Sequence, residues 1–359
     1  MTDLPDRQPA TTEARIVTPD PKRMADALCA CYAEHEIEAE PMGASVRRLA
    51  YRGHAVMLGE EATGLVVTLE SPTQDSLVAI REGFARFLSQ VDAEAVNQLS
   101  WSGGLAEGLP PGFREVTLLG ARLIAPSLMR MTFSGGDLAP FTRDGLHVRL
   151  MVPTIEGRAP VWPTMQANGL IRWPDGDDRL TVRVYTVRDV RPEKGELDID
   201  VVVHQGGAFS DWAMQARPGA RIGMTGPGGG FLPDTEDWLL LGGDLTALPA
   251  LCRILEMMPE SARGHAVLTV PDRVEEPLFL HRPEGIRVDL VSERDDPERL
   301  VEAMSRIAPP SDVCVSGWFG GEFAQAQSMR KHFKSGLRLS KSKQLSVAYW
   351  RKGVPQGGG

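Results

Sequence analysis

Arg183-Val184-Tyr185-Thr186-Val187-Arg188 is the stretch of this sequence that decides the fold. Its mixture of β-branched, aromatic and charged residues is typical of a β-strand, in which alternate side chains lie on the same face. Arg183 and Tyr185 therefore project the same way, and the Thr186 hydroxyl follows directly. A cation, an aromatic ring and a hydroxyl at this spacing suit the pyrophosphate, the isoalloxazine and the ring nitrogen of a flavin. An ordinary strand with charged ends is the alternative interpretation.

Short stretches with the character of strands surround this segment from Phe113 onward. They are separated by Gly, Pro and Asp, the residues that favour turns. The predicted strands are 115–125, 128–133, 147–152, 180–187 and 196–203. Regularly spaced short strands predict an antiparallel barrel or sandwich. We therefore expect a flavin-binding β-barrel domain at residues 113–232.

A predicted helix start follows the last of these strands. The strand ends at His204, and a Gly-Gly turn leads to Ala208-Phe209-Ser210-Asp211-Trp212. The first N–H groups of a helix have no partner within the helix and attract anions. We expect Ser210 and the helix start at Trp212 to seat a pyrophosphate, with His204 in contact with the flavin. A histidine that merely ends a strand is the alternative for His204.

Strands and helices alternate beyond Asp237. An apolar strand at 238–241 leads through Gly242-Gly243-Asp244 into a helix at 246–258, and further strands and helices follow. This order predicts a parallel, doubly wound sheet, in a nucleotide-binding domain at residues 233–353. Such sheets bind ligands at the carboxyl ends of their strands, so Asp244 and Thr246 are expected to meet a nicotinamide. A simple helix cap is the alternative for both residues.

The remaining segments complete a multidomain α+β organisation. A chain of 359 residues exceeds what one hydrophobic core usually fills. Residues 1–100 predict a small α/β domain of unknown role. Residues 101–112 are rich in Gly and Pro and predict a linker, and residues 354–359 form a short tail.

Charge is unevenly distributed along the chain. The whole sequence has a net charge of −9, and eight cations without an acid follow Glu322, which leaves −17 over residues 1–322. Clustered cations attract anions, so we expect an anionic ligand near Lys331, Lys334, Arg338, Arg351 and Lys352. A solvated basic surface is the alternative. Nucleic acid is disfavoured, because the rest of the chain would repel it.

Composition excludes several other classes of protein. No apolar run approaches the roughly 18 residues that cross a bilayer, and the first residues do not form a basic-then-apolar signal. We expect no membrane insertion and a cytoplasmic protein. The four cysteines lack the spacing of a zinc site, so no metal site is predicted.

Four segments resemble the siderophore-interacting protein family, whose members are NAD(P)H-dependent ferric-siderophore reductases with a ferredoxin-reductase-like layout. The matching segments are 183–188, 198–204 with Ser210 and Trp212, 243–250, and 349–353. Leu245 departs from the family pattern, because an acidic residue usually stands there. Residues 14–95 resemble a small domain of uncharacterised function that is found alone or ahead of such reductases.

The resemblance implies FAD as the cofactor, NADPH or NADH as the electron donor, and a ferric siderophore as the substrate. Arg183 would hold the pyrophosphate, Tyr185 would pack on the flavin, and Thr186 would bond near the flavin N5. The flavin carries the electron chemistry, so no side chain is expected to be catalytic. The anionic iron chelate would bind at Arg351 and Lys352, with Lys331 and Arg338 as further candidates. The alternatives are a flavin or electron-transfer reductase with a protein partner and a non-enzymatic siderophore-binding protein.

Overall fold

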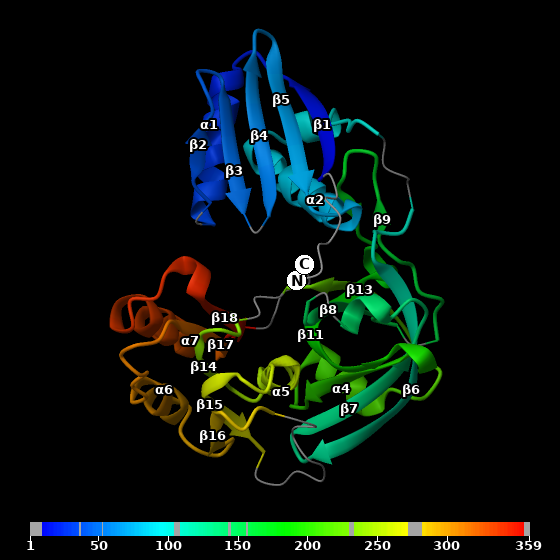
Figure 1. Cartoon of the computed structure of the whole chain (residues 1–359). Helices are drawn as coiled ribbons and strands as arrows, with labels where there is room; N and C mark the ends of the chain where they lie inside the picture. The colour runs from blue at the N-terminus through cyan, green and yellow to red at the C-terminus, as the bar shows by residue number, and fades with distance from the viewer. Residues whose placement is uncertain are drawn as a thin grey trace. The chain divides into compact units, whose positions relative to one another are not determined.

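The chain divides into two units, each with its own hydrophobic core (Figure 1). The computed structural model describes residues 9–35, 37–51, 53–103, 108–142, 145–155, 157–229, 233–271 and 282–354. Unit 1 comprises residues 1–112 and 161–176, and unit 2 comprises residues 113–160 and 177–359.

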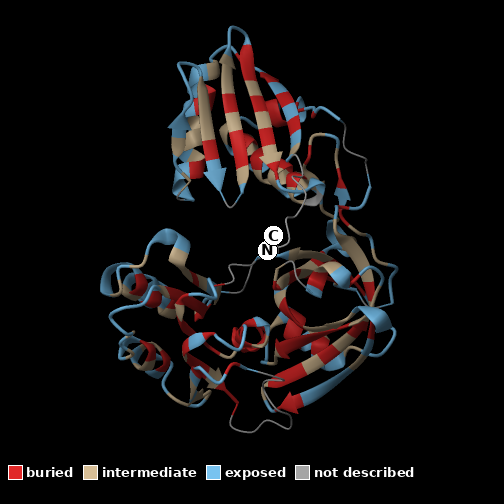
Figure 2. Ribbon diagram, viewed as in Figure 1, coloured by how far each residue is buried: buried red, intermediate tan, exposed pale blue. Residues whose placement is uncertain are grey.

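Unit 1 is a five-stranded antiparallel sheet in the order β1-β5-β4-β3-β2, with helices packed on one face. Its elements are β1 (Ala10–Val17), α1 (Pro21–Glu34), β2 (Ala39–Pro41), β3 (Val46–Tyr51), β4 (His54–Glu61), β5 (Gly64–Ser71), α2 (Gln74–Val91) and α3 (Ala93–Asn97). Buried and less buried residues alternate along β5 (Figure 2), and Leu65, Val67 and Leu69 on its buried face are fully enclosed. This alternation is the pattern of a strand with one face in the core.

A hairpin from the second half of the chain completes unit 1. Residues 161–176, the hairpin arm, contain β9 (Thr164–Met165) and β10 (Ile171–Arg172). The backbone N–H of Met165 donates to the carbonyl of Gly108 over 2.7 Å, and the indole of Trp101 donates to the carbonyl of Asn168 over 3.1 Å. Trp101 lies in the predicted linker, yet it is only 4% exposed and belongs to the core of unit 1.

The first half of unit 2 is a closed six-stranded barrel in the order β11-β12-β7-β6-β13-β8. Its strands are β6 (Phe113–Ala125), β7 (Leu128–Ser134), β8 (His147–Pro153), β11 (Leu180–Arg191), β12 (Glu196–Val202) and β13 (Arg221–Gly228), and α4 (Ala208–Gln215) follows β12. The sequence did not predict β13, which closes the barrel by pairing with both β6 and β8. Residues 183–188, called the flavin-motif segment below, lie on β11, within the barrel.

The second half of unit 2 is a parallel sheet in the order β16-β15-β14-β17-β18. Its elements are β14 (Trp238–Gly243), α5 (Leu248–Met257), β15 (Arg263–Val270), β16 (Ile286–Ser292), α6 (Glu298–Ser305), β17 (Val315–Glu322), α7 (Phe323–Lys331) and β18 (Gln344–Trp350). Short helical turns occur at η1 (Ala139–Thr142), η2 (Gly176–Asp178), η3 (Pro192–Lys194), η4 (His332–Gly336) and η5 (Lys341–Lys343). The predicted multidomain fold, an antiparallel barrel followed by a parallel α/β sheet, is confirmed.

The barrel and the parallel sheet share one hydrophobic core within unit 2. Leu128 and Leu146 of the barrel pack in the same cluster as Leu251 of α5. Helix α5 therefore lies between the barrel and β14, whereas α6 and α7 pack on the opposite face of the sheet. None of the described helices is both long and apolar enough to span a membrane.

Candidate functional site

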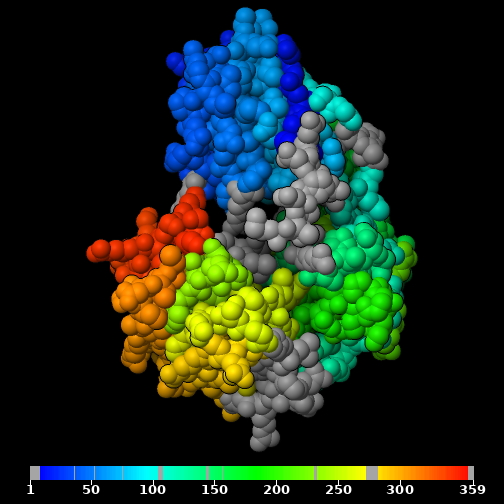
Figure 3. Space-filling model, viewed as in Figure 1, coloured from blue at the N-terminus to red at the C-terminus, as the bar shows by residue number. Residues whose placement is uncertain are grey.

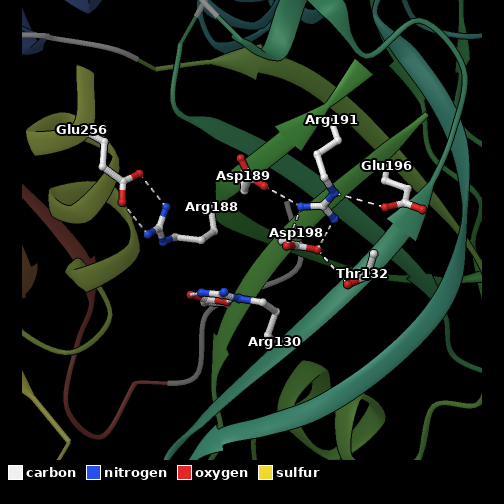
Figure 4. A network of polar contacts seen from close by, with 9 residues as sticks. Arg130, Thr132, Arg188, Asp189, Arg191, Glu196, Asp198 and Glu256 are labelled. Carbon is white, nitrogen blue, oxygen red and sulfur yellow. Dashed lines mark hydrogen bonds and ion pairs between the residues drawn. The ribbon is translucent and has the colours of Figure 1, made fainter. Parts of the chain in front are cut away.

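Three arginines on β11, Arg183, Arg188 and Arg191, differ in their partners, and Figure 4 shows the latter two. Arg188 forms two hydrogen bonds, of 2.8 and 2.7 Å, with the carboxylate of Glu256. Arg191 lies among three carboxylates, those of Asp189, Glu196 and Asp198. Arg183, in contrast, donates to the carbonyl of Val182 over 2.7 Å and has no carboxylate partner among the described residues. Of these three guanidinium groups, that of Arg183 is the one left for the anion of a ligand.

Tyr185 lies against the aromatic side chains of α4. Its ring centroid is 4.5 Å from that of Phe209, and the Phe209 centroid is 5.2 Å from that of Trp212. Burial raises the pKa of the Tyr185 phenol, and the nearby Arg183 opposes this shift. The phenol is therefore neutral at physiological pH. Phe209 thus contacts both Tyr185, which is predicted to pack on the flavin, and Trp212, which is predicted to belong to the helix start that seats the pyrophosphate.

Thr186 is buried, with 4% of its surface exposed, and no described residue forms a hydrogen bond with its hydroxyl. It pairs across the strands with His147 of β8. The sequence analysis did not select His147, whose Nε2 is joined to the hydroxyl of Tyr349 by a hydrogen bond of 2.8 Å. Burial, assisted by the charge of Arg253, lowers the pKa of His147 to about 4. A local sequence pattern gives no signal for His147, because the β8–β11 register is a long-range property.

Helix α4 starts at Ala208, the first residue of the segment that the sequence predicts as a helix start, with Gly207 as its N-cap. The Ser210 hydroxyl accepts from the N–H of His204 and donates to its carbonyl, both over 2.8 Å. A Cβ at position 207 would lie 2.7 Å from Nε2 of His204, so a larger residue there would displace the His204 ring from its present position. Ser210 therefore closes the loop between β12 and α4. The N–H groups free to meet a phosphate are those of the first helical turn.

Asp244 and Thr246 form a compact turn at the carboxyl end of β14. One oxygen of Asp244 accepts from the N–H of Thr246 over 2.8 Å and from its hydroxyl over 2.5 Å. The other oxygen accepts from the indole of Trp350 over 2.7 Å. Burial raises the pKa of Asp244, and these hydrogen bonds oppose the shift. The two residues shape the approach to α5, whose N-cap is Ala247.

The predicted anion-binding cations separate into two groups. Arg351 lies 4.5 Å from the ring centroid of Phe323, and the N–H of Lys352 donates to Glu322, so both lie at the carboxyl edge of the sheet with Trp350. Lys331 ends α7, and Arg338 precedes β18. The seven residues of β18 separate its two ends by about 20 Å. The segments after residue 300 form the orange and red surface of Figure 3. The structure does not bring all four cations together.

Arg149 is a further cation that the sequence analysis did not select. It lies on β8 opposite Val184 of β11, and Val184 is 60% exposed. No described carboxylate pairs with Arg149. It lies two residues from His147 and so belongs to the same strand face. Its position in a predicted strand was visible in the sequence, but its place beside the flavin motif was not.

These groups fit FAD. Arg183, which has no carboxylate partner in the described part of the chain, and the N–H groups of α4 suit a pyrophosphate, and the aromatic side chain of Tyr185 suits a flavin ring. Thr186 adds a hydroxyl, on a residue that is 4% exposed, to which no described residue forms a hydrogen bond, so it is available to donate to a ligand.

Family models match the two halves of unit 2. Residues 117–231 match the siderophore-interacting FAD-binding domain, and residues 236–353 match the siderophore-interacting protein domain. Neither match extends into residues 1–116. The family assignment thus concerns the barrel and the parallel sheet.

Similar proteins are found among both curated sequences and solved structures. The chain is 31% identical over 239 residues to the ferric vibriobactin reductase ViuB of Vibrio cholerae, covering 65% of this chain and 87% of the relative. It is 29% identical over 245 residues to the NADPH-dependent ferric-chelate reductase of Escherichia coli, covering 66% and 92%. The siderophore-interacting protein SipS of Aeromonas hydrophila superposes with a TM-score of 0.56 at 31% identity, covering 67% and 92%. With both domains matched and these relatives covered over most of their length, the chain belongs to the siderophore-interacting protein family.

Proposed function

We propose that this chain is an FAD-dependent oxidoreductase that uses NAD(P)H to reduce the Fe(III) of a ferric siderophore to Fe(II). The observation that carries the proposal is the contrast along β11, where carboxylates pair with Arg188 and Arg191 but no carboxylate of the described residues pairs with Arg183. The reductase relatives from Vibrio cholerae and Escherichia coli support the reaction class.

The barrel, residues 113–232, would hold FAD. Arg183 binds the pyrophosphate together with the first N–H groups of α4, while Ser210 and His204 keep that helix start in place. Tyr185 packs on the flavin, with Trp212 completing the aromatic group, and Thr186 donates its hydroxyl near N5. FAD supplies the conversion of a two-electron donor into the one-electron steps that iron requires.

The parallel sheet, residues 233–353, would hold the nicotinamide nucleotide. Its candidate contacts are in the Asp244–Thr246 turn, at the carboxyl edge where parallel sheets bind ligands. Both oxygens of Asp244 already accept hydrogen bonds from this chain. Asp244 therefore orients the turn, and the backbone of the turn faces the nucleotide.

The anionic iron chelate would bind at Arg351 and Lys352, and we add Arg149, which has no described carboxylate partner, as a further candidate. Lys331 and Arg338 lie apart from these residues and are weaker candidates for binding the substrate. Fe(II) binds hard oxygen ligands less tightly than Fe(III), so reduction also releases the iron. We place this release in the cytoplasm, where NAD(P)H is generated.

The test is anaerobic reduction of ferric siderophores by the purified protein, with a colorimetric chelator that traps Fe(II). We expect a yellow protein, and a ferrous signal that requires FAD and either NADPH or NADH. FAD that is reduced by the nucleotide without any ferrous signal would favour a reductase that serves a protein partner. A colourless protein that binds ferric siderophore would favour the non-enzymatic alternative.

A further inference from the structure

Helix α5 connects the two places that the proposed reaction must hold together. The Asp244–Thr246 turn lies immediately before α5, and Arg253 and Glu256 near its end contact β11. A helix of ten residues is about 15 Å long and stiff. A displacement of one end of α5 is therefore transmitted to the other.

Arg253 fixes α5 to the backbone of the barrel. It is 6% exposed, and its guanidinium donates to the carbonyl of Val187 over 3.1 Å and to the carbonyl of Phe141. Val187 directly follows Thr186, and its own N–H donates to the carbonyl of Leu146. The contact therefore lies one residue away from the proposed flavin neighbour.

Arg188 and Glu256 form a second contact between the same two elements (Figure 4). The Arg188 side chain is 4% exposed and that of Glu256 is 15% exposed, and their two hydrogen bonds are nearly equal in length. A further ion pair of the barrel, between Arg130 and Asp200, lies near Arg188. A two-pronged guanidinium–carboxylate pair fixes both distance and orientation.

Stability alone does not explain a buried ion pair at this position. Removing two charges from water costs several kcal/mol per ion, and apolar side chains of similar size often stabilise a fold as well or better. The apolar contacts around Leu128, Leu146 and Leu251 already join the barrel to α5. An apolar contact tolerates sliding, whereas the Arg188–Glu256 pair does not.

We propose that Arg188 and Glu256 are positioning residues that set the Asp244–Thr246 turn at a fixed distance from Thr186. The inference rests on the proposed function, because it takes Thr186 as the neighbour of FAD and the turn as the neighbour of the nicotinamide. In this inference Arg188, the last residue of the flavin-motif segment, aligns the nicotinamide with FAD and does not itself bind FAD.

The test compares a double variant, Arg188→Met with Glu256→Leu, and the single variant Glu256→Gln with wild type. The control is Glu302→Gln, which removes the same charge from the exposed pair with Arg306 on α6. For each protein we would measure FAD content, the melting temperature, hydrogen exchange of the Val187 and α5 amides, and the rate of FAD reduction by NADPH. Ferricyanide as the acceptor makes the kinetics independent of any siderophore.

The double variant should keep its FAD and its melting temperature, because apolar contacts replace the ion pair. Its maximal rate of FAD reduction should fall by about 10- to 100-fold, the effect expected when reacting groups are misplaced, with faster exchange of the α5 amides and an unchanged KM for ferricyanide. Glu256→Gln should show a smaller fall in the same rate, and it decides the question if the double variant does not fold.

Wild-type rates and wild-type exchange in a folded, FAD-loaded variant would overturn the positioning role. Loss of FAD and of thermal stability in Glu256→Gln, with an unchanged rate in the loaded fraction, would show a merely structural role and overturn it too. Failure of wild type to reduce ferric siderophores, with normal ferricyanide reduction, would contradict the proposed substrate and leave the inference standing. FAD that neither nucleotide reduces would overturn both.

Discussion

The indole Nε1 of Trp350 donates a hydrogen bond of 2.7 Å to Oδ2 of Asp244. This bond joins the end of the last strand of the sheet to the turn after its first strand, 106 residues earlier. Three N–H or O–H groups thereby converge on one buried carboxylate, two of them from Thr246. The Asp244–Thr246 turn is thus held from two sides.

Replacing Trp350 with Phe should destabilise unit 2 by about 1–2 kcal/mol, because a hydrogen bond to a charged group is lost while the ring is kept. Burial raises the folded-state pKa of Asp244 above its ordinary value, so the stability that depends on its protonation is present at low pH and is lost as the pH rises through that pKa. Without the indole the ionised form is less favourable still. Denaturation monitored by flavin fluorescence should therefore show a larger loss at pH 8 than at pH 4. An equal loss at both values would mean that the bond does not depend on the charge.

Replacing Arg183 with Gln should weaken FAD binding by about 10- to 100-fold, because a charge-assisted bond to the pyrophosphate is lost. Isothermal titration of the apoprotein with FAD measures the effect. The control is Arg158→Gln, which removes an exposed cation that pairs with Asp177 and Asp178. Equal affinities of the two variants would remove Arg183 from the FAD site.

His147 should titrate near pH 4 in the folded protein, as measured by NMR with His147→Gln to assign its signal. Because burial lowers the folded-state pKa below the ordinary value, the stability that it contributes is complete above about pH 6.5 and is lost as the pH falls towards 4. Wild type should therefore lose about 2–3 kcal/mol more than His147→Gln over that interval. A His147 signal that titrates at its ordinary pKa would contradict the buried, neutral imidazole.

Replacing Arg351 with Glu should raise the KM for an anionic ferric chelate by about tenfold and leave that for a neutral chelate nearly unchanged. The effect should shrink as salt is added, because exposed charges are screened. Lys331→Glu reverses a charge at the other end of the sheet and serves as the control. A similar loss for the neutral chelate would rule out an electrostatic role for Arg351.

Replacing Gly169 with Ala should loosen the hairpin arm. Gly169 has φ of +90°, and a Cβ there would lie 3.2 Å from the indole nitrogen of Trp101. Gly103 has φ of +80° with nothing within 4 Å of its Cβ, so Gly103→Ala carries the backbone cost of about 1–2 kcal/mol alone. Hydrogen exchange of the Met165 amide should be faster in Gly169→Ala than in Gly103→Ala. Identical exchange would mean that the arm does not depend on Trp101.

The sequence predicted those parts of the fold that depend on local patterns. The strand at 180–187 and the helix at 246–258 appear as β11 and α5 because periodicity and turn residues act over a few positions. Strand β13 was missed because Gly226-Pro227-Gly228 resembles a turn, and pairing with both β6 and β8 makes it a strand. Tertiary contacts override local preference at such a site.

The candidate site shows the same limit. Arg183, Tyr185 and Thr186 could be selected because one strand presents all three. The sequence presented Arg188 as the charged end of a strand. In the structure Arg188 is buried and pairs with Glu256, which lies 68 residues away in the sequence. His147 and Arg149 likewise could not be selected from the sequence, because their place beside the flavin-motif segment depends on the pairing of β8 with β11.

The hairpin arm also has a consequence for the order in which the chain can fold during synthesis. Residues 161–176 belong to unit 1, although they are made after β6, β7 and β8 of the barrel. Unit 1 therefore cannot be completed when the ribosome has passed residue 112. Its final contacts, at Gly108, Trp101 and Leu170, form only when half the barrel is already outside the ribosome. The N-terminal unit and the flavin barrel thus mature together, and neither is finished before the other has begun.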